Sequence, residues 1–151
     1  MKISPSKLNA LLFFKLPAAY FSGVRTTYID SEKCIATVRF KWINQNPFKS
    51  MYWAVQGMAA ELTTGALLML KINESGHPIS MLLAQSNGTF TKRVTGKVTF
   101  TCYDGGLIEN AIANTIKTGE GDSVIMNAIG INEEGTEVSN FNFEWTIKVR
   151  S

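Results

Sequence analysis

The sequence is poor in the residue types that most catalytic and metal sites require. Its 151 residues include one histidine, two cysteines and only 18% charged side chains. The histidine, His77, precedes Pro78 in a predicted loop, which leaves Ser-His and Cys-His nucleophile arrangements with one weak candidate. No Cys, His, Asp and Glu residues have the spacing of metal ligands, and no glycine-rich phosphate loop is present. We therefore expect neither a metal nor a cofactor.

Strong charge of either sign is also lacking. The net charge of +3 is modest and spread along the chain, which argues against nucleic acid as a partner. The N-terminal apolar run is short and is interrupted by Lys15, which argues against a signal peptide. Because cytosolic proteins rarely keep disulfides, we expect Cys34 and Cys102 to be reduced core residues of a cytoplasmic protein, with a disulfide as the alternative.

The chain contains no internal repeat, low-complexity tract or linker. With 45% apolar content, 151 residues can bury a sufficient core. We therefore predict one domain over residues 1–151, in which residues 1–17 form an N-terminal helical extension. Ser4 and Pro5 are typical of a helix start, and Pro17 ends the run.

The most informative segment is a long apolar run from Ser50 to Ile72. Asn46-Pro47 is typical of a turn before this run, and Ser50 is a suitable N-cap. The sequence therefore predicts a helix over this run with a length of about 33 Å. That length also fits a membrane span. The flanking segments have the pattern of amphipathic strands, however, so we favour a buried core helix and expect no membrane partner.

Glu61 is the only ionisable side chain between Tyr52 and Leu70. Burial disfavours a charged carboxylate, and proteins often keep such a group for its chemistry. We therefore take Glu61 as a candidate catalytic residue. The alternative is a structural carboxylate that is hydrogen-bonded to Thr64 or to the backbone of a partner.

Alternating apolar and polar residues predict strands on both sides of this helix. The alternation is regular over residues 34–42, 93–102 and 140–149, less regular over 79–90 and 123–131, and a short first strand is expected over 23–29. Gly135 suits a hairpin turn between the last two strands, and a smaller helix is expected over residues 107–116. This order predicts an α+β fold in which one long central helix is wrapped by a curved antiparallel sheet of about six strands.

This arrangement resembles the hotdog fold, and the residues around the helix start resemble thioesterases of the phenylacetate-pathway type. In that group an Asn or Gln lies in the loop before the helix, a His-Gly-Gly stretch opens the helix, and an Asp or Glu follows about two turns later. Asn46 and Glu61 match the loop amide and the acid, whereas Tyr52-Trp53-Ala54 stands in place of His-Gly-Gly. The resemblance covers roughly residues 24 to 149. It is closest to a thioesterase-like branch typified by residues 46–50 and 58–62.

The resemblance implies a hydrolase that cleaves a coenzyme A or acyl-carrier thioester at the interface of a homodimer or a dimer of dimers. Glu61 of the partner subunit would attack the carbonyl or activate water, Asn46 would add a hydrogen bond, and the backbone N–H of Trp53 would stabilise the oxyanion. We expect the strand over residues 34–42 to pair across the two-fold axis, since an exposed strand edge is a liability.

Further residues are expected to contact the substrate. Tyr52 and Trp53 would form its wall, with Thr64 near the acid, and Lys92 and Arg93 would meet the phosphates of coenzyme A. Solvated bend residues are the alternative for the two cations. For the whole protein, the alternative to an enzyme is a non-catalytic hotdog module that binds an acyl or aromatic ligand.

Overall fold

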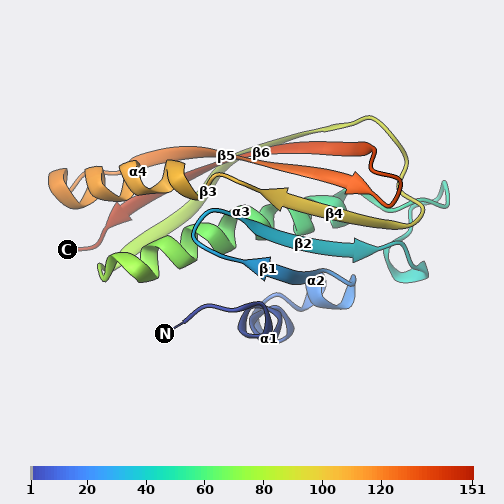
Figure 1. Ribbon diagram of the computed structural model, residues 1–151, viewed down its shortest axis with the longest axis horizontal. Coiled ribbons are helices and arrows are strands. Elements are labelled where there is room, and N and C mark those ends of the chain that lie inside the picture. Colours follow the sequence, from blue (N-terminus) through green and yellow to red (C-terminus); the bar gives the residue numbers. More distant parts are fainter. Residues whose placement is uncertain (1) are drawn as a thin grey trace.

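The computed structural model describes residues 2–151, which form four helices, one 3-10 turn and six strands (Figure 1). In chain order these elements are α1 (Pro5–Lys15), α2 (Pro17–Phe21), β1 (Arg25–Ile29), β2 (Cys34–Arg39), η1 (Trp42–Asn44), α3 (Trp53–Ser75), β3 (Ile79–Phe90), β4 (Lys97–Cys102), α4 (Gly105–Thr118), β5 (Asp122–Asn132) and β6 (Glu137–Val149). The predicted α+β class, with one long helix and about six strands, is confirmed.

All six strands belong to one antiparallel sheet in the order β1-β2-β4-β5-β6-β3. α3 lies across one face of this sheet, against β2, β4 and β5, whereas α4 packs near one end of α3 against β5 and β6 (Figure 1). Within residues 2–151, no helix combines the length and the apolar character that a membrane span requires.

The middle of α3 is tied closely to β6. A Cβ at Gly65 would lie 3.3 Å from the ring of Trp145, so the missing side chain lets the helix and the indole approach each other. The indole N–H of Trp145 donates a 2.9 Å hydrogen bond to the hydroxyl of Thr64. Together these contacts fix where the sheet begins to cover this face of α3.

The start of α3 differs from the prediction. The helix begins at Trp53 rather than at Ser50, because the hydroxyl and the N–H of Ser50 are bonded to the side chain of Asn46. Oδ1 of Asn46 accepts from the N–H groups of Phe48 and Ser50 at 2.9 and 3.2 Å, which closes an Asx turn. Tyr52 is the N-cap residue and makes no side-chain cap bond.

The strand that was expected over residues 34–42 is shorter and is not an edge strand. β2 ends at Arg39, and Trp42 lies in η1 with 80% of its surface exposed. β2 pairs with β1 on one side and with β4 on the other, so its backbone has no free edge for a second copy. The expected pairing of this strand across a two-fold axis is therefore wrong. Among the strands of residues 2–151, β1 and β3 are the free edges of the sheet.

β3 changes its inward-facing positions halfway along the strand. Ile79, Met81 and Leu83 face the core before a bulge opposite β6, which lies between Leu83 and Gln85. After the bulge, the ladder shifts by one residue and Gly88 faces the core residue Phe141. This shift breaks the period-two pattern, which explains the irregular alternation over this part of the sequence.

Cys34 and Cys102 are free, buried and directly opposite each other on β2 and β4. Burial raises the pKa of each thiol to about 12. Neither thiol therefore ionises near neutral pH, and neither has the thiolate character of a nucleophile. The prediction of reduced core residues is confirmed.

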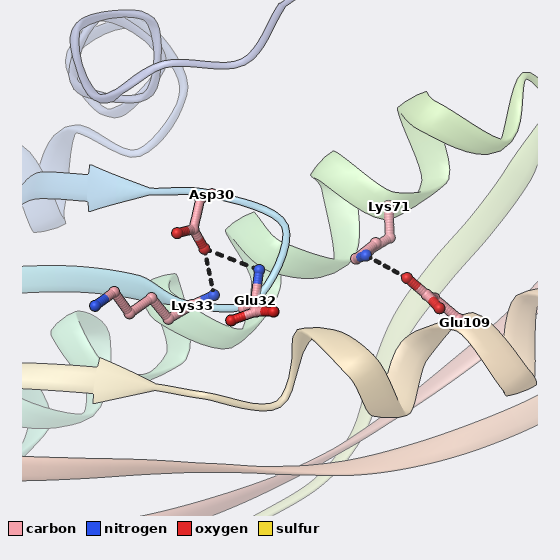
Figure 2. Close-up of polar contacts among 5 residues, drawn as sticks. All are labelled: Asp30, Glu32, Lys33, Lys71 and Glu109. Carbon is pink, nitrogen blue, oxygen red and sulfur yellow. Dashed lines mark hydrogen bonds and ion pairs between the residues drawn. The ribbon is translucent and has the colours of Figure 1, made fainter.

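Figure 2 shows polar contacts at two places, one between α3 and α4 and the other within the turn that joins β1 and β2. The side chain of Lys71 on α3 is only 8% exposed, and its Nζ lies 2.6 Å from Oε1 of Glu109 on α4. The hydrogen bond from this ammonium lowers the pKa of the Glu109 carboxyl. Asp30 closes the turn between β1 and β2, where its Oδ1 accepts from the N–H groups of Glu32 and Lys33, each at 2.8 Å.

The substitution Glu109→Ala is expected to lower the thermal midpoint at pH 7, because it leaves the buried Lys71 ammonium without a partner. A carboxyl whose folded pKa is lowered contributes stability above its unfolded pKa, and that contribution is lost as the pH falls through the folded pKa. The difference from the wild type should therefore shrink in acid. Scanning calorimetry measures both effects. The further change Lys71→Met should recover most of the midpoint, and an unchanged midpoint in Glu109→Ala would contradict a stabilising pair.

Candidate functional site

An apolar pocket of about 770 Å³ opens between α3 and the strands β3 and β6. It is lined by Trp53, Ala54, Gly57, Met58, Glu61, Leu83, Ser86, Asn87, Gly88, Phe90, Phe141 and Phe143. Glu61 is the one charged side chain in this lining. A pocket of this size and character suits an acyl or aromatic group, with a single carboxyl group in its wall.

One face of α3 forms a wall of this apolar pocket. Ala54, Gly57, Met58 and Glu61 line it, and their spacing of three and four residues places them in one row along the helix. The row continues to Gly65, where the ring of Trp145 lies against the backbone. The contact between α3 and β6 therefore marks the end of the open row.

The Glu61 carboxylate has no hydrogen-bond or ion-pair partner within residues 2–151. Removal from water raises the pKa of this carboxyl above its ordinary value of 4.5. The shift brings the group toward the range in which a carboxylate is an effective proton acceptor at neutral pH. Thr64, a candidate partner, donates instead to the backbone carbonyl of Glu61 at 2.9 Å and accepts from Trp145. Its hydroxyl is fully buried and is used by the fold.

Glu61 also borders a smaller apolar cavity of about 250 Å³. Met58, Glu61 and Leu62 of α3 contribute one side of this cavity. The other side comes from the end of α1 and the start of α2, through Leu12, Lys15, Leu16, Pro17, Ala18 and Ala19. The carboxyl group thus lies between two apolar spaces, which accounts for its loss of solvation.

Asn46 lies in a separate, polar pocket of about 390 Å³ beside the start of α3. This polar pocket is lined by Asn46, Ser50, Met51, Trp53, Gln56, Phe90, Thr91, Lys92, Arg93 and Val94. Nδ2 of Asn46 donates to the Ser50 hydroxyl at 3.0 Å, while its Oδ1 accepts from backbone N–H groups of the loop. Within one chain, Asn46 and Glu61 therefore line different pockets.

Trp53 and Phe90 line both pockets and mark the boundary between them. Their ring centroids are 6.4 Å apart. At the same place, the backbone N–H groups of Trp53 and Ala54 have no acceptor within residues 2–151, as is usual in the first turn of a helix. Tyr52 is half-exposed beside Trp53 and is not among the residues that line either pocket. The boundary thus presents free N–H donors to a bound anion or oxyanion.

Lys92 and Arg93 both line the polar pocket. The Arg93 guanidinium donates to the carbonyl of Phe48, so it also holds the loop that follows Asn46. The Lys92 ammonium has no hydrogen-bond or ion-pair partner within residues 2–151. These two side chains give the polar pocket a positive rim.

Gln56 is a residue that the sequence prediction missed. It lies one turn into α3, lines the polar pocket and is 4% exposed, and its Oε1 is buried without a hydrogen-bond partner. The signal in the sequence is a neutral polar residue within an apolar run, which a count of ionisable residues does not register. No three His, Cys, Asp or Glu side chains of residues 2–151 gather as a metal site requires.

A family model described as "Domain of unknown function (DUF4442)" matches residues 7–147 of the chain. No curated protein matches the sequence. Among solved structures, a protein of unknown function from Chlorobaculum tepidum TLS is 19% identical, with a TM-score of 0.84 over 97% of this chain and 98% of that chain.

Two other solved structures are named for an activity. A protein from Pseudomonas aeruginosa, called a probable thioesterase, is 18% identical with a TM-score of 0.82, over 97% of both chains. A thioesterase from Haemophilus influenzae is 15% identical with a TM-score of 0.76, over 99% of this chain and 93% of that chain. At these identities the likeness shows the fold, and the predicted hotdog fold is confirmed.

The unpaired carboxylate predicts an unusual dependence of stability on pH. A carboxyl whose folded pKa is raised contributes stability below its unfolded pKa, and that contribution is lost as the pH rises through the folded pKa. Glu61→Gln should therefore be more stable than the wild type at pH 8 and equally stable near pH 4. Urea unfolding at both pH values measures the difference. The exposed Glu74 on the same helix provides the control, Glu74→Gln. If the free energy of unfolding of the wild type instead rises relative to that of Glu61→Gln as the pH rises, the carboxylate is paired.

Proposed function

We propose that the chain, which belongs to the DUF4442 family, is a thioester hydrolase that acts on an acyl-CoA or acyl-carrier thioester at a site shared by two subunits. The observation that carries this proposal is the position of Glu61. It is an unpaired, desolvated carboxylate in the wall of an apolar pocket that begins at the free N-terminus of a helix.

The chemistry assigns one role to each region. The acyl group occupies the apolar pocket, and the thioester carbonyl lies at the start of α3, where the free N–H groups of Trp53 and Ala54 and the positive end of the helix dipole favour the oxyanion. Glu61 takes a proton from water as the water oxygen attacks the carbonyl carbon. The C–S bond then breaks and the leaving sulfur takes the proton back from Glu61, which gives a carboxylic acid and a thiol. Direct attack by the carboxylate is the other route to the same products.

Helix geometry supports a site built from two chains. Trp53 and Glu61 are eight residues apart, which corresponds to about 12 Å along one helix. A carboxylate at that distance does not reach a carbonyl held at the N-terminus of its own helix. If two copies of α3 lie antiparallel about a two-fold axis near Gly57, the midpoint of this segment, each Trp53 comes opposite Glu61 of the partner subunit.

The surface around Gly57 has room for such an approach. A Cβ at this position would meet only the ring of Phe141 in its own chain, at 3.8 Å. Each site would then combine Asn46 and the helix start of one subunit with Glu61 of the partner subunit. Homodimers of this kind can also associate in pairs. The free thiols Cys34 and Cys102 support a reducing, cytoplasmic setting.

A non-catalytic module that binds an acyl or aromatic ligand is the second candidate. It is favoured by two observations at the start of α3. The side-chain amide of Asn46 is already bonded within its loop, and the bulky Trp53 separates the two pockets at the place where a carbonyl would bind.

Thiol release from a panel of acyl-CoAs separates the two candidates. The wild type should hydrolyse at least one member, and Glu61→Gln should lower kcat by about two to four powers of ten, because it removes the base but keeps the shape of the side chain. Glu74→Gln is the matched control and should keep the wild-type rate. A wild type without activity on any thioester would favour the binding module, and a fully active Glu61→Gln would make Glu61 structural.

Mixing two inactive variants tests whether the site is shared. Asn46→Asp keeps the acceptor that closes the turn but removes the donor, and its charge opposes an oxyanion, so it should be inactive. After subunit exchange with Glu61→Gln, about a quarter of the sites should be intact, because half of the dimers are mixed and each mixed dimer has one unaltered site. Ellman kinetics and light scattering follow activity and assembly. No recovery in a mixture of proven dimers would place both residues of a site on one chain.

A further inference from the structure

Within residues 2–151, three buried side-chain oxygens have no hydrogen-bond partner, and they belong to Thr26, Gln56 and Ser139. Of these residues, Gln56 lines the polar pocket. The residue is 4% exposed, and its Oε1 is buried without a hydrogen-bond partner within residues 2–151. An unpaired buried amide oxygen costs stability, because its hydrogen bonds to water are lost and nothing replaces them. Native proteins rarely keep such a group unless something else satisfies it.

The position of Gln56 indicates which kind of group satisfies its side-chain amide. It lines the polar pocket, together with Trp53 and the positive residues Lys92 and Arg93. The ring of Trp53 separates this pocket from the apolar one, so the polar pocket begins where the thioester carbonyl is placed. A ligand that leaves the apolar pocket past Trp53 therefore enters a pocket that is lined by Gln56 and the two cations.

The chemistry of the Gln56 carboxamide limits the class of ligand that can bind there. The buried Oε1 requires a donor. Of the two cations that line the polar pocket, Lys92 has no partner within residues 2–151, and it is exposed at the rim. A side-chain carboxamide offers one acceptor and two N–H donors, which matches the single N–H and C=O of a secondary amide. In a thioester of coenzyme A or of a carrier protein, the group that follows the sulfur is a pantetheine arm, which contains secondary amides and ends in a phosphate.

We propose that Gln56 is a specificity-determining residue that binds a secondary amide of the pantetheine arm, with Lys92 placed toward the phosphate. This assignment rests on the proposed function for the identity of the ligand, but binding of the arm does not require hydrolysis. Coenzyme A and acyl carrier protein share this arm, so Gln56 recognises the chemistry common to both.

Gln56→Met is the decisive variant. Methionine has a similar length and shape and removes the unpaired oxygen, so the variant should fold with a thermal midpoint at or above that of the wild type. The probe is 4′-phosphopantetheine, which contains no thioester, and its binding is measured by titration calorimetry. Loss of one buried hydrogen bond should weaken binding about tenfold. Gln85→Met, at an exposed position of β3 outside both pockets, should bind like the wild type.

Two further comparisons distinguish the source of the amide. The first comparison uses two thioesters of the same acyl group. The thioester of N-acetylcysteamine has one amide, and that of 2-mercaptoethanol has none. The ratio of kcat/KM for the first to kcat/KM for the second should fall about tenfold in Gln56→Met. Affinity for desulfo-coenzyme A and for holo-acyl carrier protein, which carries the phosphopantetheine arm, should fall by the same factor.

The outcomes separate this proposal from the proposed function. If the wild type binds phosphopantetheine through Gln56 but hydrolyses no thioester, the proposed function fails and the arm site stands. If the wild type hydrolyses thioesters but Gln56→Met binds phosphopantetheine as tightly as the wild type, the arm site is overturned and the proposed function stands. A loss confined to coenzyme A would place Gln56 on the nucleotide and would also overturn the proposal.

Discussion

The structure depends on the burial of one long apolar helix. Residues 53–70 of α3 include one ionisable side chain, so nearly every side of this part must be covered, and the sheet, α2 and α4 cover most of it. The hydrogen bond from Trp145 to Thr64 and the close approach of the Trp145 ring to Gly65 determine where β6 begins to cover α3. The part of α3 that remains uncovered is the row of Ala54, Gly57, Met58 and Glu61. The uncovered part of an otherwise buried helix is therefore also the wall of the candidate site.

Much of the fold follows from periodicity, because burial imposes a period of two on strands and of 3.6 on helices. The boundaries do not follow in the same way, since they depend on competing local bonds. Ser50 was a reasonable N-cap in sequence, but its hydroxyl is taken by Asn46, and the helix starts three residues later. The bulge after Leu83 and the early end of β2 at Arg39 are similar cases, in which pairing with neighbouring strands decides the outcome.

The candidate site was only partly predictable, for a physical reason. A lone carboxylate in an apolar run is visible in the sequence, and Glu61 does face an apolar pocket. Which groups surround it depends on the rotation of the helix and on strands far away in the chain. The hydroxyl of Thr64 is therefore taken by Trp145, and Asn46 lies in a neighbouring pocket. Gln56 does not stand out in the sequence, because a neutral amide gains significance only when burial leaves its oxygen without a partner.

The order of strands also has a consequence for how the chain reaches its structure. β3 is paired only with β6, and its first residue, Ile79, lies opposite Val149 near the end of the chain (Figure 1). During synthesis, β3 leaves the ribosome well before its partner exists. Contacts between such distant segments form slowly, and an unpaired apolar strand is prone to wrong associations in the meantime. Of the six strands of this sheet, β6 is translated after the other five, so a chain that stops before β6 has an apolar pocket without one of its walls.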